Sequence, residues 1–95
     1  MIKFDNENLT VKLEKYSYGD IAICLTDEEG MPYATMSVHV DGVQADGCIV
    51  LKDYYENKDI AKACVDQGLF IPTGVMVPVG NVECPLCKVN MDMIG

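Results

Sequence analysis

The segment Cys84-Pro85-Leu86-Cys87 has the residue types and spacing most suited to chemistry in this chain. Two cysteines separated by two residues can close a redox disulfide or supply half of a zinc site. Local structure decides whether they can do so. Residues three apart in a strand point to opposite faces, whereas in a turn or helix both thiols can converge. Cys84 and Cys87 therefore define one functional alternative, a thiol protein that binds zinc or cycles between thiol and disulfide.

Two features of the sequence weigh against this alternative. A zinc site needs two further ligands, and the remaining choices are Cys24, His39, Cys48 and Cys64. None of these has a partner at the tight spacing of typical zinc modules. Thioredoxin-like chemistry places its cysteine pair at the start of a helix, and no helical pattern follows Cys87. The sequence predicts structural cysteines, with no resident metal and no cofactor.

Catalytic signatures are also missing from the sequence. His39 is the single histidine and has no serine or cysteine near it in a nucleophile signature, so we expect it on the surface of a strand. Acid pairs such as Glu28 with Glu29, or Asp53 with Glu56, are typical of solvated turns. The glycine-rich motifs that cradle nucleotide phosphates do not occur. We therefore assign no catalytic residue and predict a protein that is not an enzyme.

The length and composition indicate one small domain, 1–95, with a modest core. No run of about 18 apolar residues occurs, and the first residues lack the apolar stretch of a secretory signal. The number of cysteines, 5, is odd, which suits a reducing compartment. We expect a cytoplasmic protein whose ends, 1–7 and 91–95, fray.

The charge balance narrows the choice of partner. The chain has a formal net charge of -8 and a pI of about 4.3, and all seven of its basic residues are lysines. Arginine is the usual residue for bidentate contacts to phosphates and base edges, so direct binding to DNA or RNA is disfavoured. An acidic surface can instead attract a basic protein surface, or it can simply keep a small domain in solution.

Apolar alternation and turn residues define the expected strands. They cover 9–16, 21–26, 33–40, 48–51, 75–79 and 82–89. Tyr18-Gly19-Asp20 and Asp27-Glu28-Glu29-Gly30 are predicted turns, the second with its glycine in the left-handed region. In the third strand, the better core face consists of Ala34, Met36, Val38 and Val40. Pro85 cannot donate to a ladder, so the last strand belongs at an edge or a bulge.

A single helix is predicted at about 58–67. Asn57 is a suitable N-cap, because its side-chain oxygen can accept from a free amide of the first turn, and Gly68 suits the left-handed residue that ends the helix. The expected buried face contains Ile60, Ala63, Cys64 and Gln67. Consecutive antiparallel strands with one helix on one face predict a two-layer α+β fold, with a sheet of about 4–6 strands.

Several short segments have a familiar combination of turns and a helix cap. They are Tyr18-Gly19-Asp20, Gly30-Met31-Pro32-Tyr33-Ala34-Thr35, Glu56-Asn57, Gly68-Leu69-Phe70 and Thr73-Gly74. With these segments the sequence resembles a family of small uncharacterised bacterial domains carried on mobile elements and phages of Gram-positive gut bacteria. The likeness runs from about Leu9 to Val89. It implies an accessory protein of a mobile element, and it transfers no catalytic role to any residue.

Tyr54 and Tyr55 lie just before the helix among charged residues, where one ring can enter the core and the other can offer a rigid interface contact. The full set of partner-binding candidates is Asp27, Glu28, Glu29, Asp53, Tyr54, Tyr55 and Glu56. We predict a non-enzymatic interaction module that docks on a basic surface, such as that of a nucleic-acid-handling host protein, and so inhibits or regulates it. A further alternative is a structural accessory subunit or homodimer. Met76 and the expected exposed valines at 75, 77 and 79 would then lie on an unpaired edge open to strand addition.

Overall fold

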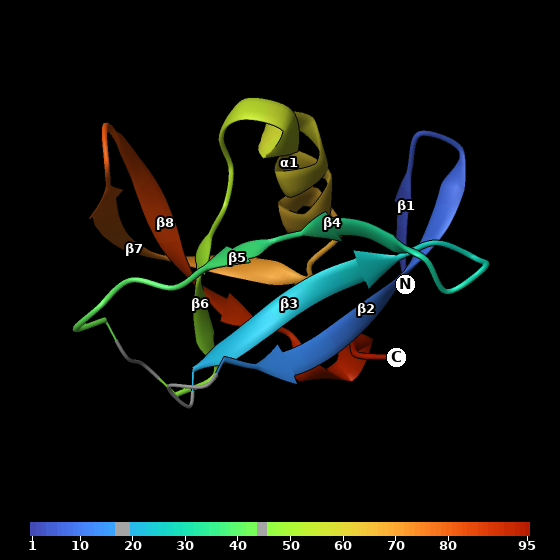
Figure 1. Ribbon diagram of the computed structural model, residues 1–95, viewed down its shortest axis with the longest axis horizontal. Helices are drawn as coiled ribbons and strands as arrows, with labels where there is room; N and C mark the ends of the chain where they lie inside the picture. Colours follow the sequence, from blue (N-terminus) through green and yellow to red (C-terminus); the bar gives the residue numbers. More distant parts are fainter. Residues whose placement is uncertain (17–19, 44–45) are drawn as a thin grey trace.

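The computed structural model describes residues 1–16, 20–43 and 46–95 (Figure 1). The predicted turn at Tyr18-Gly19-Asp20 therefore lies mostly outside the described residues. The first sheet has the order β1-β2-β3-β4, formed by β1 (Ile2–Phe4), β2 (Glu7–Lys15), β3 (Ile21–Thr26) and β4 (Pro32–Thr35). The second has the order β5-β6-β8-β7, formed by β5 (Ser37–Val38), β6 (Cys48–Leu51), β7 (Phe70–Val79) and β8 (Val82–Val89). All strand pairs are antiparallel.

The α+β class is confirmed, but the strands form two four-stranded sheets where one was expected. The predicted strand 33–40 is divided between them, because β4 pairs with β3 and β5 pairs with β6. Met36 lies at the division. Its N–H donates to the Ile23 carbonyl at 2.8 Å, and its own carbonyl accepts from the Lys52 N–H at 2.8 Å. Met36 thus joins the two sheets through its own peptide groups.

The division also changes which residues of the expected strand are buried. Met36 is fully buried, as predicted, but so is Ser37, its neighbour. Strict alternation would place Ser37 in solvent. Its hydroxyl instead accepts from the Ile23 N–H at 3.1 Å and lies 3.2 Å from the Tyr16 hydroxyl. A buried hydroxyl is tolerated when it has such partners.

Helix α1 (Lys58–Asp66) follows a short 3-10 helix, η1 (Tyr55–Asn57), and ends before Gly68, which has φ +86°. The predicted span and the left-handed glycine are therefore confirmed. The predicted cap chemistry is wrong. The Asn57 side chain makes no capping hydrogen bond and instead donates through Nδ2 to the Thr35 carbonyl at 2.7 Å. Asn57 is buried, so its amide ties the start of the helix to the point where the chain changes sheets.

The main cluster of buried residues lies between the two sheets and under α1. It contains Ile2, Leu9, Val11, Ile23, Leu25, Met36, Ile49, Leu51, Ile60, Ala61, Cys64, Leu69, Phe70, Cys87 and Val89. From the helix, Ile60 and Cys64 enter it as predicted, and Ala61 joins them although it was not expected there. Of the other two residues of the predicted face, Ala63 is only partly buried and Gln67 is exposed. The Gln67 side chain is exposed and bonds to the Lys3 backbone at 2.9 and 2.8 Å. The helix thus contacts both outer strands, β1 and β7, and covers the core between them.

Both ends of the chain are packed, although the sequence suggests fraying. Ile2 in β1 is fully buried and pairs with Leu9. A second 3-10 helix, η2 (Met91–Met93), follows β8, and Ile94 packs against the main cluster. The Gly95 N–H then donates to the Val11 carbonyl at 2.9 Å. Each end therefore gains a backbone partner on β2.

A smaller outer cluster covers the other face of the second sheet. Its buried members are Val50, Val77 and Cys84. Partly buried side chains surround them: Val38, Val40, Val43, Tyr54, Val79, Val82 and Leu86. Among the three β7 valines that were expected to be exposed, Val77 is therefore buried, Val79 is partly buried and Val75 is exposed.

The β7–β8 hairpin explains the place of Pro85. β8 is an inner strand, so the edge position expected for Pro85 is wrong, but the alternative of a bulge holds. The register of β7 shifts between Pro72 and Met76, and Pro85 pairs with Met76 at the end of that irregularity. The ladder between β6 and β8 stops at Leu86, so the missing N–H of Pro85 interrupts no pair there.

Candidate functional site

The two cysteines of the Cys84–Cys87 pair lie on opposite faces of β8. Cys84 belongs to the outer cluster and Cys87 to the main cluster, and both are fully buried. Burial raises the pKa of the Cys84 thiol, with a further contribution from the Asp53 carboxylate, and it raises the pKa of Cys87 to about 11. Thiols held protonated on opposite sides of a strand are poorly placed to bond to each other or to share a metal ion.

The other cysteines are also dispersed. Cys64 is buried beneath α1, where burial raises its pKa to about 12, and Cys24 and Cys48 are partly exposed in different sheets. Within residues 1–16, 20–43 and 46–95, no three cysteine, histidine or carboxylate side chains come together as metal ligands. The arrangement fits cysteines used as small apolar residues.

The β3–β4 turn contains three of the predicted partner-binding acids, and one of them supports the turn itself. Asp27 Oδ1 accepts from the N–H groups of Glu29 and Met31, both at 2.9 Å, and Gly30 has φ +82°. The predicted turn with a left-handed glycine is thus confirmed. Because Asp27 is used by the backbone, Glu28 and Glu29 are the exposed acids of this turn.

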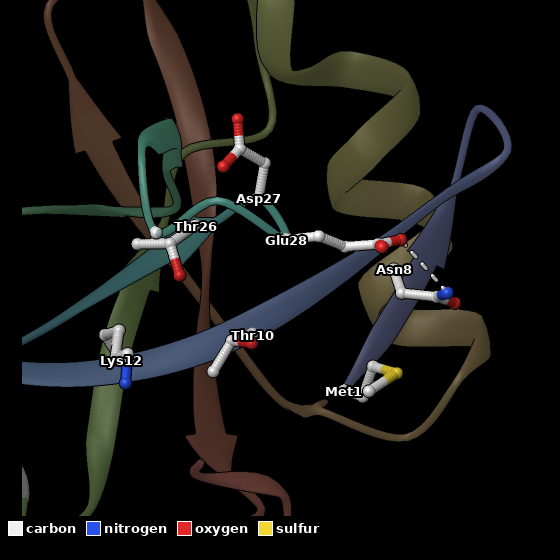
Figure 2. A pocket seen from close by; sticks show the side chains of 8 residues that line it. Met1, Asn8, Thr10, Lys12, Thr26, Asp27 and Glu28 are labelled. Atoms are coloured by element: carbon white, nitrogen blue, oxygen red, sulfur yellow. Dashed lines mark hydrogen bonds between the residues drawn. The ribbon is translucent and has the colours of Figure 1, made fainter.

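An open concavity lies beside this turn on the surface of the first sheet. Its lining consists of Met1, Asn8, Thr10, Lys12, Thr26, Asp27, Glu28 and Gly30. Figure 2 shows the Glu28 side chain extended toward Asn8, whose amide donates to it at 3.3 Å, while the Asp27 carboxylate points away from this contact. The side chains of the lining offer two hydroxyls, one amide, one lysine amine and two carboxylates. It gathers no set of groups positioned for proton transfer or nucleophilic attack.

The second group of candidates forms the corner between β6 and α1, which we call the tyrosine corner (residues 52–56). The Tyr54 and Tyr55 rings meet edge to face, with centroids 5.2 Å apart. Tyr54 packs on the outer cluster, whereas Tyr55 is 80% exposed. Tyr55 also has φ +53°, in the left-handed region that a bulky side chain rarely occupies. The structure thus has one ring packed on the protein and one in solvent, as the sequence predicted.

Charged side chains brace the tyrosine corner. Lys52 Nζ lies 3.0 Å from Glu56 and 5.9 Å from the centre of the Tyr54 ring. The Glu56 pKa is lowered by its own backbone N–H and by Lys52, so Glu56 is already paired within the chain. Asp53 acts on the pKa of both Cys84 and Cys87, which places its carboxylate near β8. Within this corner, Tyr55 is therefore the predicted candidate most available to a partner.

The two groups of candidate residues lie in different parts of the molecule. In Figure 1 the β3–β4 turn lies beyond β1 at one end, whereas the chain entering α1 from β6 lies on the far side of the helix, toward the β7–β8 hairpin. The seven partner-binding candidates therefore do not form one continuous acidic patch. A partner that contacts the tyrosine corner would leave the turn free.

His39 takes part in a contact that sequence reasoning did not find. Its Nδ1 lies 2.5 Å from Asp20 Oδ2, its Nε2 lies 3.0 Å from Asp41 Oδ1, and the Tyr16 ring is 5.7 Å away. The bond to Asp41, followed by that to Asp20, raises the pKa of His39 against the effect of burial. A neutral imidazole has only one N–H, so two carboxylates favour the charged ring. With both nitrogens engaged, His39 is poorly placed to activate a nucleophile. Asp41 is close in sequence, but nothing in the sequence pairs His39 with Asp20.

The longest helix among the described residues is α1, which is too short and too polar to cross a membrane. Comparison of the chain with family models, curated proteins and solved structures finds no match.

Proposed function

We propose that this chain is a non-enzymatic protein–protein interaction module and that the tyrosine corner is its main contact. The observation that carries this proposal is Tyr55, which is 80% exposed although its backbone has φ +53°. A non-glycine residue in this region costs about 1–2 kcal/mol, and such conformations gather at ligand clamps and other functional sites. An exposed ring that is held in this way suits contact with a partner.

The surroundings of Tyr55 support a preorganised contact. Tyr54 packs against it edge to face, and the pair Lys52–Glu56 spans the segment from one side to the other. Asn57 anchors the next residue through its bond to the Thr35 carbonyl. A rigid aromatic side chain loses little conformational entropy on binding, which is why tyrosine often dominates interfaces.

The composition supports a basic partner. The net charge is -8 without a single arginine, so attraction to a positively charged protein surface is favoured over direct contact with a nucleic acid. We propose that the chain acts in the cytoplasm as an accessory protein of a bacterial mobile element. In this proposal it inhibits or regulates a nucleic-acid-handling host protein by covering its basic surface.

The proposal is tested by retention of partners from a lysate of a Gram-positive bacterium that carries such an element, at low and high salt. Tyr55→Gly removes the ring and suits the backbone, so we expect a folded variant that retains far less of the basic protein bound by the wild type. Met31→Ala is the matched control, because Met31 is 58% exposed on the distant turn. The double change Glu28→Lys and Glu29→Lys tests the charge of that turn. Undiminished retention by Tyr55→Gly would refute the proposal.

A further inference from the structure

We propose that the docking surface extends from the tyrosine corner across the outer cluster and takes a partner segment with apolar side chains flanked by lysine or arginine. This inference rests on the proposed function and specifies the chemistry of the partner. The surface, here called the valine face, is formed by the partly buried side chains of Val38, Val40, Val43, Val79, Val82 and Leu86.

The valine face lies on the side of the second sheet away from the first sheet and α1, and within residues 1–16, 20–43 and 46–95 no second layer of strands or helices packs on it. Along β8, Cys84 and Leu86 belong to the outer cluster, whereas Cys87 and Val89 belong to the main cluster. The first sheet and α1 pack on the main-cluster side. Among the described residues, three are buried on the other side, and six apolar side chains around them are only partly buried. A sheet face with a small buried centre and partly exposed apolar side chains around it is typical of a surface that packs against a partner.

The valine face and the tyrosine corner are continuous. Tyr54 packs on the outer cluster, and the Tyr55 ring lies against Tyr54. Figure 1 shows the chain leaving β5, the β7–β8 hairpin and the connection from β6 to η1 on the same side of α1. Tyr55 therefore stands at the border of the valine face, where a partner segment can touch both.

Charge distinguishes a basic partner from a second copy of the chain. Asp53 lies near Cys84, and Asp41, which contacts His39 Nε2 at 3.0 Å while its side chain stays fully exposed, follows Val40 directly. Lys52, which precedes Asp53 in the chain, is paired with Glu56, and Lys88, two residues after Leu86 on β8, lies opposite Cys48 at the end of the ladder. A second copy would bring the same acids and a net charge of -8 to this face. Basic residues beside the apolar part of a partner would instead contact these acids, and this attraction would favour binding.

Strand addition at the neighbouring edge of β7 is blocked by its prolines. Val79 pairs with Val82 across a two-residue turn, so the peptide groups of Val79 and Val77 face β8 and those at Pro78 and Met76 face outward. Pro78 has no N–H to offer. Pro72 faces outward as well, because the N–H of Val89 on β8 bonds away from β7, to Gly47, and Cys87 opposite Pro72 has the same orientation. The partner is therefore expected on the face of the sheet and not on its edge.

A β-forming peptide can probe this surface directly. We would titrate the isotope-labelled protein with a peptide of about eight residues in which valine alternates with lysine, so that all valines line one face. Backbone resonance changes should centre on Val40, Val43, Val82 and Tyr55. The double variant Val79→Thr and Val82→Thr keeps shape and charge but should weaken binding about tenfold. Met31→Thr, at the distant turn, should leave it unchanged.

Three results would overturn the inference: no binding of the peptide, equal binding of a peptide with the same composition but scattered valines, or changes centred on the β3–β4 turn. Changes in the same resonances on raising the protein concentration alone, without peptide, would assign the face to a second copy instead. If the threonine variant still retains the lysate partner and Tyr55→Gly does not, this inference fails and the proposed function stands. Retention by Tyr55→Gly removes the proposed function itself.

Discussion

The main cluster and the outer cluster lie on opposite faces of the same strand, β8, yet they are closed to different degrees. The main cluster has fifteen buried members among the described residues and is enclosed by two sheets and α1. The outer cluster has three and is bordered by side chains that are only partly buried. Large residues such as Phe70 and Leu25 fill the first, whereas valines dominate the second. The comparison indicates that one face of β8 contributes to the larger core, and the other face carries the smaller cluster that we propose as part of a docking surface.

The largest expected effect separates the two clusters by stability. Phe70→Ala removes a fully buried ring from the main cluster and should lower the free energy of unfolding by about 3–5 kcal/mol. Val82→Ala, at the border of the outer cluster, should lower it by less than about 1 kcal/mol, because that side chain is only partly buried. Denaturant titration measures both. Equal losses would mean that the outer cluster is a second structural core.

A smaller effect is expected where the tyrosine corner is attached to the main cluster. Asn57→Ala removes a buried amide and leaves the Thr35 carbonyl without the donor from which it now accepts, at an expected loss of about 1–3 kcal/mol. Asn57→Asp supplies an acceptor in place of the donor and should not restore stability. The same unfolding measurement decides. If Asn57→Asp were as stable as the wild type, the side chain would act as a helix cap after all.

The strain at Tyr55 predicts that glycine is more stabilising than alanine at this position, the reverse of the usual order. Both Tyr55→Gly and Tyr55→Ala remove the ring, but only glycine adopts φ +53° without strain. The glycine variant should therefore be more stable than the alanine variant by about 1 kcal/mol. Thermal unfolding of the two proteins provides the comparison. A more stable alanine variant would show that the corner relaxes when the ring is absent.

The smallest expected effect is the pH dependence of stability at His39, which precedes Val40 of the valine face. The pKa of His39 is raised by Asp41 and Asp20, so the charged ring stabilises the folded state. That stabilisation is complete below the unfolded pKa of about 6.5 and is lost as the pH rises through the higher folded value. At pH 5, His39→Gln should therefore have a lower free energy of unfolding than the wild type. Above the folded pKa of His39, the difference between the two proteins should be smaller. Unfolding curves across this range test the sign, which a constant difference would contradict.

Much of the secondary structure could be predicted from the sequence, because it depends on local signals. Alternating apolar residues predicted β2 and β3, a compact apolar run predicted β6, and the expected last strand has the bounds of β8. The turn chemistry of Asp27 and Gly30 was also identified correctly. The division between β4 and β5 could not be predicted, since Met36 and its neighbours continue the same alternation through the change of sheet. Only bonds to Ile23 and Lys52, distant in sequence, show where one sheet ends.

The candidate site was predicted in its residue types but not in its geometry. Tyr54 and Tyr55 were identified from their position before the helix, whereas the left-handed backbone of Tyr55 has no sequence signal, because tyrosine does not favour it. The valine face was missed because Val38 and Val40 were expected on the same core face as Met36, whereas the structure places them in the outer cluster. The contact between His39 and Asp20 joins residues 19 apart in sequence, and neither spacing nor composition indicates it.

The position of Met36 has a consequence for how the molecule opens. Its N–H belongs to the first sheet and its carbonyl to the second, with Ile23 and Lys52 as the respective partners. Neither sheet can separate from this residue without disturbing the backbone that the other depends on. The amide protons of Met36 and Lys52 should therefore exchange with solvent only when the whole chain unfolds, so that the two sheets behave as a single cooperative unit.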